Sequence, residues 1–238
     1  MIWFGRDEND RLRILGMPVS SLWEGDLNAS LDNFEPENPS LLVPRKLGLG
    51  WDFNLAALAV KAGWIRPDDS LPDLAEYVPN WLRRAMKIAP VVGGAALVVG
   101  AAKVATMDHV ATNWSLTGKP TKWGSGKQAA IMPLLVTGAM AAMPTVAKKL
   151  TKAKPAESTE ATSLNHQAEV LGIEALSLAL LCATAKSAGK NEKRQVASVI
   201  APLLWAAVSG GLQVGIVKVT LCINAETLLE NGKRGTCR

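Results

Sequence analysis

The segment of the chain that most resembles a catalytic motif is residues 124–127, Gly-Ser-Gly-Lys. A phosphate-binding loop needs a further glycine five residues before the second glycine, and a Ser or Thr after the lysine to hold a metal ion. Thr121 and Gln128 occupy those two positions here. The segment also lies between two apolar runs, whereas a phosphate-binding loop joins a strand to a helix. We therefore reject nucleotide chemistry at this segment.

Other residue types that support catalysis or metal binding are sparse in this sequence. The histidines and cysteines, none of which shows the spacing of a metal site, are His109, His166, Cys182, Cys222 and Cys237. Cys182 falls within an apolar run, where cysteine behaves as a small apolar residue. We expect no metal, no cofactor and no enzymatic activity, which leaves binding as the chemistry to look for.

The basic and aromatic residues are placed as in a membrane protein. The formal net charge is +5, but the Lys and Arg residues gather in short clusters beside apolar runs, as they do at the ends of membrane helices. The chain has eight Trp against one Tyr and three Phe. Trp suits a membrane interface, where its N–H stays in water and its ring in hydrocarbon. We expect lipid contact and no nucleic-acid partner.

Four apolar runs follow after residue 87. Their predicted limits are residues 88–107, 129–146, 170–185 and 196–217. The first has twenty residues, and a helix of that length rises about 30 Å, the thickness of the bilayer hydrocarbon. A buried soluble bundle is the alternative, but three runs of eighteen residues or more fit it poorly. We predict a mainly α integral membrane protein with about four transmembrane helices, in which residues 88–238 form the membrane domain.

A few polar and small residues within these runs attract attention. Lys103 lies about one turn from the end of the first run, where its ammonium can extend to the interface. Glu174 lies in the third and shortest run, and an acid inside a bilayer is rare enough to be a functional candidate unless it sits near the headgroups. Gly211 and Gly215 have the spacing of a close-packing motif, so we predict that they contact another helix.

Residues 1–87 are polar and rich in turn signals, which predicts a water-facing, partly irregular N-terminal arm. Within this arm, residues 51–64 have Trp at both ends and apolar residues at helical spacing, namely Leu55, Leu58, Ala59 and Ala62. Two readings are open: an amphipathic helix along the headgroups, or a short helix packed on the domain or on a partner. Residues 74–87 are a second helix candidate.

The flanking charges predict the orientation. With the arm in the cytoplasm, ten Lys and Arg residues flank the spans on the inner side and seven on the outer side. Cytoplasmic flanks carry the excess of positive charge in membrane proteins. We therefore predict a multi-pass protein of the cell membrane, with the arm and the C-terminus inside.

The loop between the first two runs, residues 108–127, reads DHVATNWSLTGKPTKWGSGK. It resembles the short membrane domain at the N-terminus of SdpI-type bacteriocin-immunity proteins. In that family the loop reads Leu-Pro-Asp, then Ile-Pro-x-His-Trp-Asn, then Gly-x-Pro-Asp, a Trp or Tyr, and Gly-Ser-Lys. The matching positions here are Asp108, Val110, Trp114, Gly118, Pro120, Trp123, Gly124, Ser125 and Lys127.

The loop also departs from the family pattern. The family His falls on Asn113, the two prolines on Met107 and Ala111, and the second acid on Thr121, while Gly126 is an extra residue. It stays open whether the family activity survives these changes. The resemblance implies binding roles for Asp108, Asn113, Trp114, Gly118, Pro120, Trp123 and Lys127.

A second resemblance lies in the arm. Residues 36–54 are similar to a short uncharacterised bacterial domain that reads roughly Asn-Pro-x-Asp-Pro-x-Leu-x-Val-Pro-Lys-Arg-x-Gly-x-Gly-Trp-x-x-Asn. That domain is often joined to the first in one polypeptide. Neither domain has an established chemistry to transfer.

The residues of the 108–127 loop permit two interpretations by themselves. Trp114 and Trp123 can anchor an interfacial turn at headgroup depth. Alternatively, the loop is a recognition surface for a peptide or a protein. We predict a non-enzymatic membrane protein that binds such a partner, with an accessory subunit of a larger complex as the alternative. An intramembrane enzyme or transporter ranks last, because only Glu174 and Lys103 are available at depth.

Overall fold

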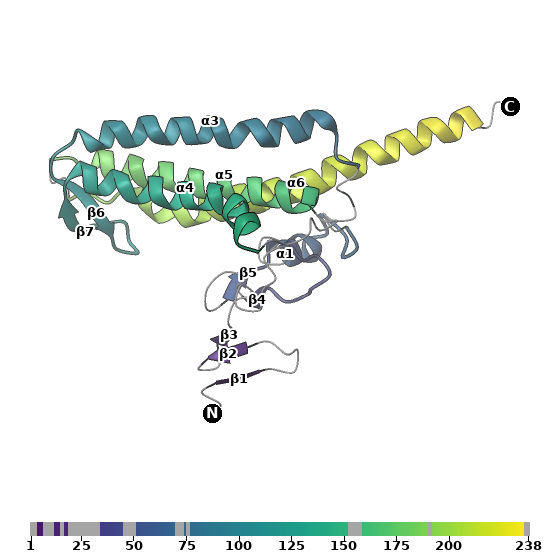
Figure 1. Ribbon diagram of the computed structural model, residues 1–238, viewed down its shortest axis with the longest axis horizontal. Helices are drawn as coiled ribbons and strands as arrows, with labels where there is room; N and C mark the ends of the chain where they lie inside the picture. The colour runs from purple at the N-terminus through teal and green to yellow at the C-terminus, as the bar shows by residue number, and fades with distance from the viewer. Residues whose placement is uncertain are drawn as a thin grey trace. The chain divides into compact units, whose positions relative to one another are not determined.

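The computed structural model of the chain describes residues 4–6, 12–14, 17–18, 34–44, 51–69, 74, 77–151, 159–189 and 192–235. Helices dominate these residues (Figure 1). Four of the helices are long and apolar enough to cross a membrane, over Asn80–Ala105, Gly126–Val146, Ser163–Lys186 and Val196–Ile223. The chain is therefore a mainly α, multi-pass membrane protein, as its sequence predicts.

The long helices are α3 (Asn80–Ala105), α4 (Gly126–Thr151), α5 (Thr159–Lys186) and α6 (Val196–Gly235). The short helix α1 (Leu55–Lys61) lies in the arm. The strands form three small antiparallel sheets: β1 (Phe4–Arg6), β2 (Leu12–Ile14) and β3 (Met17–Pro18); β4 (Leu42–Pro44) and β5 (Trp51–Phe53); β6 (Val110–Trp114) and β7 (Pro120–Gly124).

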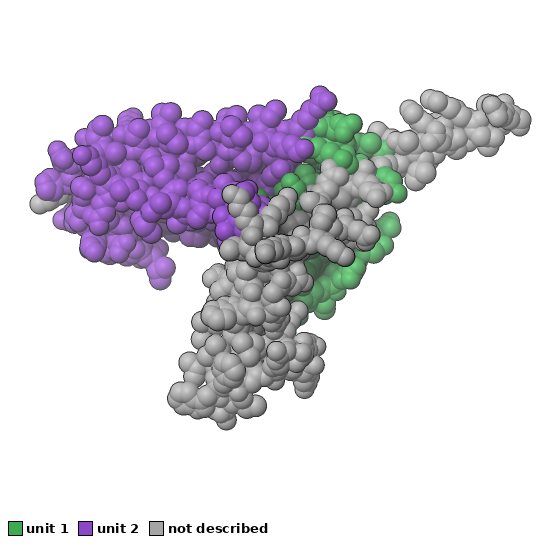
Figure 2. All heavy atoms as spheres, in the orientation of Figure 1, with its two compact units in different colours: residues 1–83, 147–166, 212–238 green, residues 84–146, 167–211 purple. Residues whose placement is uncertain are grey.

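The chain divides into two compact units that are not continuous in sequence (Figure 2). The first comprises residues 1–83, 147–166 and 212–238, and the second comprises residues 84–146 and 167–211. The second unit contains α3, most of the apolar length of α4 and α5, and the first part of α6, together with the β6–β7 hairpin.

Helices α3 and α4 expose large apolar side chains. Val91 and Val99 of α3 are each 70% exposed, and Met132 and Leu135 of α4 are 61% and 60% exposed. A water-soluble bundle would bury such a surface, because a continuous exposed apolar patch of this kind is rare outside binding sites. Lipid tails solvate it without cost, so these two helices present their outer faces to the bilayer.

Helix α5 lies at the centre of the second unit. Buried side chains from three helices form the apolar core of this unit: Leu97, Ala101 and Val104 of α3, Ala130 of α4 and Leu181 of α5. The most apolar part of α5 is 44% buried, against 17% for α3 and 11% for α4. A helix with neighbours on several sides needs no single apolar face, which explains why polar residues can lie inside it.

Three of the predicted runs differ in their limits from the helices that contain them. The third run was expected to be short, from 170 to 185, but α5 covers the 28 residues Thr159–Lys186. A helix of that length exceeds the roughly 20 residues needed to cross the hydrocarbon. The fourth run was expected to end at 217, whereas α6 continues to Gly235. The first helix ends at Ala105, before the predicted limit of 107.

The predicted helix over residues 51–64 is wrong at both ends, because Trp51–Phe53 is strand β5 and α1 covers only Leu55–Lys61. Asn54 separates the two elements: its amide donates to the carbonyl oxygens of Glu35 and Asn38 at 2.8 and 3.1 Å. Its side-chain oxygen accepts from the N–H of Ala57 at 3.2 Å and so caps α1.

The buried face of α1 differs from the predicted one. Ala56, Ala57 and Ala59 are buried, whereas Leu58 is 43% exposed. This pattern agrees with the reading of a short helix packed on its own domain. The second predicted helix covers residues 74–87. Its last eight residues form the beginning of α3, so they are not a separate helix. Residues 75 and 76 lie outside the described part of the chain.

Candidate functional site

The loop between α3 and α4 is a β-hairpin formed by β6 and β7. β6 and β7 pair with Val110 opposite Gly124, Asn113 opposite Lys122 and Trp114 opposite Pro120. Two register shifts interrupt the ladder around Asn113. The signal for these strands was available in the sequence, because two short stretches rich in Val, Thr and Trp flank a turn that contains Gly118.

Gly118 makes the turn of this hairpin and also its contact with the start of α6. Its φ of 77° lies in the left-handed region that favours glycine. Its carbonyl oxygen accepts a hydrogen bond from the N–H of Gln195 at 2.8 Å. A β-carbon at this residue would lie 2.7 Å from the carbonyl oxygen of Gln195 and 2.8 Å from Cγ2 of Val199. Only glycine therefore fits this contact without displacement.

A second set of hydrogen bonds holds β6 against the end of α5. The N–H of Ala111 donates to Oγ of Ser187 at 2.8 Å, and that hydroxyl donates to the carbonyl oxygen of Thr184 at 2.6 Å. Ala111 and Ser187 are both fully buried. The backbone of the hairpin is thus held by hydrogen bonds to the residue that follows α5 and to the residue that precedes α6, which fixes its position.

Residue 126, the extra residue of the loop, is a glycine for a steric reason. Its N–H donates to the carbonyl oxygen of Met107 at 3.0 Å, where α4 begins beside the end of α3. A β-carbon at Gly126 would overlap the carbonyl oxygen of Val104. The glycine therefore permits a close approach of the two helices at the hairpin.

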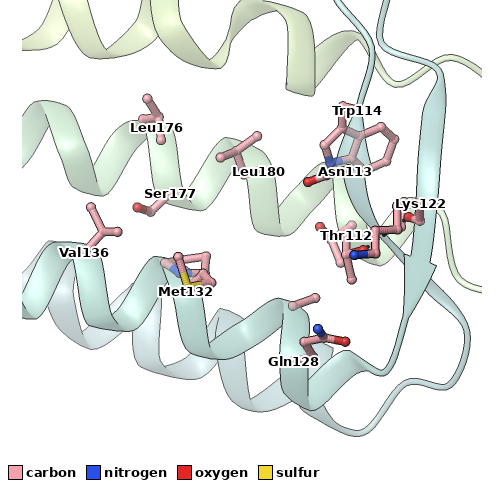
Figure 3. Close-up of a pocket in the computed structure, with 14 residues that line it drawn as sticks. Thr112, Asn113, Trp114, Lys122, Gln128, Met132, Val136, Leu176, Ser177 and Leu180 are labelled. Atoms are coloured by element: carbon pink, nitrogen blue, oxygen red, sulfur yellow. Dashed lines mark hydrogen bonds between the residues drawn. The ribbon is translucent and has the colours of Figure 1, made fainter.

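A cavity of about 340 Å³ lies between the hairpin, α4 and α5 (Figure 3). Its mouth is polar and is formed mainly by hairpin residues and the first turn of α4: Thr112, Asn113, Trp114, Lys122 and Gln128. The rest of its lining is largely apolar and comes from the two helices: Met132, Val136, Leu176 and Leu180. The cavity therefore matches a ligand that is polar at one end and apolar at the other.

Two buried hydroxyl groups of α5, Ser177 and Thr184, also line the cavity. Oγ of Ser177 lies 3.2 Å from Oγ1 of Thr137 on α4, and either can be the donor. This hydrogen bond joins α4 to α5, so the hydroxyl group of Ser177 is engaged in structure. The polar residues at the mouth, Asn113, Lys122 and Gln128, are exposed.

The cavity brings together only part of the residues predicted from the loop. Asn113 and Trp114 line it. Gly118 shapes the turn, and Pro120 begins β7. The other three do not line it: Asp108 and Lys127 are exposed, and Trp123 is half-buried on β7.

Most of the cavity was missed by reasoning from the sequence. Lys122 and Gln128 lie within or beside the loop but match no family position, and Leu176, Ser177 and Leu180 come from a helix that follows much later in the chain. No pattern in the sequence links that helix to the hairpin. At the predicted packing glycines Gly211 and Gly215, no atom of the described residues lies within 4 Å of a β-carbon position.

The end of the second unit that carries the hairpin is strongly basic. Its described cationic residues are exposed: Lys103, Lys119, Lys122, Lys127, Lys186, Lys193 and Arg194. The acids of the same described stretches are Asp108 and Glu192. Opposite charges attract at such a surface, so an anionic group is favoured at the mouth of the cavity. No group of three His, Cys, Asp or Glu side chains gathers as metal ligands would anywhere in the described part of the chain.

These features define a class: an α-helical, multi-pass membrane protein with a hairpin-capped cavity at one end of its helices. Residues 36–61 match the model of a protein family of unknown function, DUF5808. This match covers the segment in which Asn54 joins β5 to α1, and it includes the 36–54 stretch of the second resemblance. No curated protein and no solved structure matched the chain.

Proposed function

We propose that this chain is a non-enzymatic protein of the cell membrane that binds a peptide or protein partner at the hairpin-capped cavity. The observation that carries the proposal is the cavity of about 340 Å³ with a polar mouth and apolar walls. Two of its lining residues, Asn113 and Trp114, belong to the loop that resembles the SdpI-type membrane domain. That resemblance supports a peptide or protein as the ligand.

The dimensions and chemistry of the cavity favour insertion of one or two side chains of a partner. Ligand pockets range from about 300 to 1,000 Å³, so this one is at the small end. Apolar side chains of the partner would contact Met132 and Leu180, while the amides of Asn113 and Gln128 would pair with its backbone. Lys122 would pair with a carboxylate of the partner.

The proposed orientation places the hairpin outside the cell. The arm and the hairpin are separated by one span, α3, and the excess of flanking Lys and Arg favours a cytoplasmic arm. The cavity would then meet a partner that arrives from outside or along the outer leaflet.

Photo-crosslinking in native membranes tests the proposal. Met132 and Ile131 are neighbours on α4 and are 61% and 52% exposed, but only Met132 lines the cavity. A photoreactive residue at 132 should give a discrete peptide or protein adduct that the same residue at 131 does not give. Leu180→Trp, which fills the cavity, should remove the adduct. Equal adducts from both positions, or lipid adducts alone, would contradict a partner site here.

An accessory subunit of a larger membrane complex is the second candidate function. It is favoured by the open face of α6 at Gly211, where a neighbouring helix can approach closely because nothing occupies the space. Extraction in mild detergent followed by native electrophoresis should then show a large assembly. Gly211→Leu should release the chain from that assembly, whereas Leu180→Trp should not. Migration of the native chain as a monomer would exclude this function.

A further inference from the structure

The carboxyl group of Glu174 is buried within a membrane span. Glu174 lies in the candidate span Ser163–Lys186 of α5 and is 3% exposed. Among the described residues, its Oε2 atom is inaccessible and has no hydrogen-bond partner. The two spans that follow and precede α5 in the chain contain no Asp or Glu.

Two consecutive glycines of α3 provide the space for this carboxyl group. Oε2 of Glu174 occupies the position that a β-carbon at Gly93 would need. A β-carbon at Gly94 would lie 3.5 Å from Oε1. The carboxyl group of α5 thus fills a notch in α3, and we call Glu174 with Gly93 and Gly94 the acid notch.

No cationic side chain faces the acid notch from the helices of this unit. On α3 the nearest basic residues are Lys87 and Lys103, six and nine positions from the two glycines, and Lys103 is exposed. On α4 no titratable side chain lies between Lys127 and Lys148, and on α6 none precedes Lys218. On α5 the nearest acid is Glu169, whose Oε2 accepts a hydrogen bond from Nε1 of Trp205 at 3.2 Å.

An isolated ionised carboxylate is very unfavourable in such surroundings, whereas the neutral acid is tolerated. We infer that the acid notch is a proton-binding site within the membrane. The carboxyl group of Glu174 holds a proton while α3 covers it, and it releases that proton only when α3 moves and admits water or a cation. This role goes beyond partner binding and does not depend on it.

The acid notch adjoins the cavity through α5. Ser177, which lines the cavity, follows Glu174 by three residues, slightly less than one helical turn. A movement of α5 at the cavity would therefore also change the contact between Glu174 and α3.

Whether Glu174 carries a proton can be tested on the full chain in phospholipid vesicles with dicyclohexylcarbodiimide, an apolar reagent that reacts with protonated carboxyl groups. The carboxylate oxygen bonds to the central carbon of the reagent and the acid proton passes to one of its nitrogens; the adduct then rearranges to a stable N-acylurea. Mass spectrometry should find this addition on Glu174 at neutral pH and less of it as the pH rises. A water-soluble carbodiimide should label the exposed Glu192 but not Glu174. Reaction of Glu174 with the soluble reagent as fast as Glu192 would overturn the proposal.

Thermal unfolding gives a second measurement that does not need reagent access. The melting temperature of the wild-type chain should fall as the pH rises, because deprotonation of a buried acid disfavours the folded state. The melting temperature of Glu174→Gln should fall markedly less over the same pH range. Identical pH dependence of the two proteins would refute the proton site.

Two glycine variants check the notch itself. Gly93→Ala should lower the melting temperature because its methyl group overlaps the carboxyl, and adding Glu174→Ala should restore it. Gly138→Ala on α4, where nothing lies within 4 Å, should have no effect. A Gly93→Ala substitution that changes neither the melting temperature nor the labelling of Glu174 by the soluble carbodiimide would show that the carboxyl group does not lie in the notch.

Discussion

Glycines near the hairpin permit contacts that any other residue would prevent. Gly118 combines a left-handed backbone with a carbonyl that accepts from Gln195, and Gly126 allows α4 to start beside Val104. Both belong to the loop that the proposed function treats as a recognition surface. At the scale of single residues, Gly118 has a structural reason to be glycine, and the proposed binding would fall to the side chains of Asn113, Trp114 and Lys122.

The steric role of Gly118 can be separated from its backbone role. Gly189 has a similar φ of 73°, but nothing lies within 4 Å of its β-carbon position. Gly189→Ala should therefore lower the free energy of unfolding only through the strain of a left-handed alanine backbone, by about 1–2 kcal/mol. Gly118→Ala should cost more, because its methyl group also meets Gln195 and Val199. Unfolding in detergent micelles measures both free energies, and equal losses would show that the hairpin does not dock tightly there.

At the scale of elements, the helices of the second unit have different surroundings although their apolar content is similar. α3 and α4 turn large apolar side chains outward, whereas α5 buries apolar and polar residues alike. Composition along the chain cannot distinguish these positions, since lipid and a neighbouring helix are equally apolar. The distinction matters because α5 supplies both part of the cavity lining and the acid of the notch.

Truncation of side chains on α5 and α3 tests this difference. Leu181 of α5 lies in the core and is 3% exposed, whereas Val99 of α3 is 70% exposed. Leu181→Ala should reduce the free energy of unfolding by about 2–5 kcal/mol, because it leaves a cavity. Val99→Ala should change it by less than about 0.5 kcal/mol, because lipid fills the space. Unfolding in micelles or bicelles measures both, and a large effect at Val99 would indicate a buried outer face.

At the scale of the whole molecule, the order of elements decides which segments share a side of the membrane. The hairpin and the connection between α5 and α6 meet through hydrogen bonds at Ser187 and Gln195. Both segments are separated from the arm by an odd number of spans. The four-span reading thus places the cavity mouth on the opposite side of the membrane from the arm.

Cysteine accessibility checks this topology. In a chain whose native cysteines are replaced by Ser, single cysteines are introduced at the exposed positions Leu116 in the hairpin and Lys61 in the arm. With the arm in the cytoplasm, an impermeant maleimide should label position 116 in intact spheroplasts and position 61 only after permeabilisation. Labelling in the reverse order would invert the orientation. Labelling of both positions in intact spheroplasts would mean that α3 does not span.

The sequence by itself determined that this chain is a mainly α membrane protein with about four spans, because length and apolarity are local properties that can be read residue by residue. It also indicated Asn113 and Trp114 and drew attention to Glu174. Only the tertiary structure decided that the loop is a hairpin docked beside the end of α5 and the start of α6, and that α5 provides part of the cavity lining. The notch at Gly93 likewise exists only because α3 packs on α5. Contacts of this kind join residues that are far apart in the chain, and no local pattern records which apolar helices become neighbours.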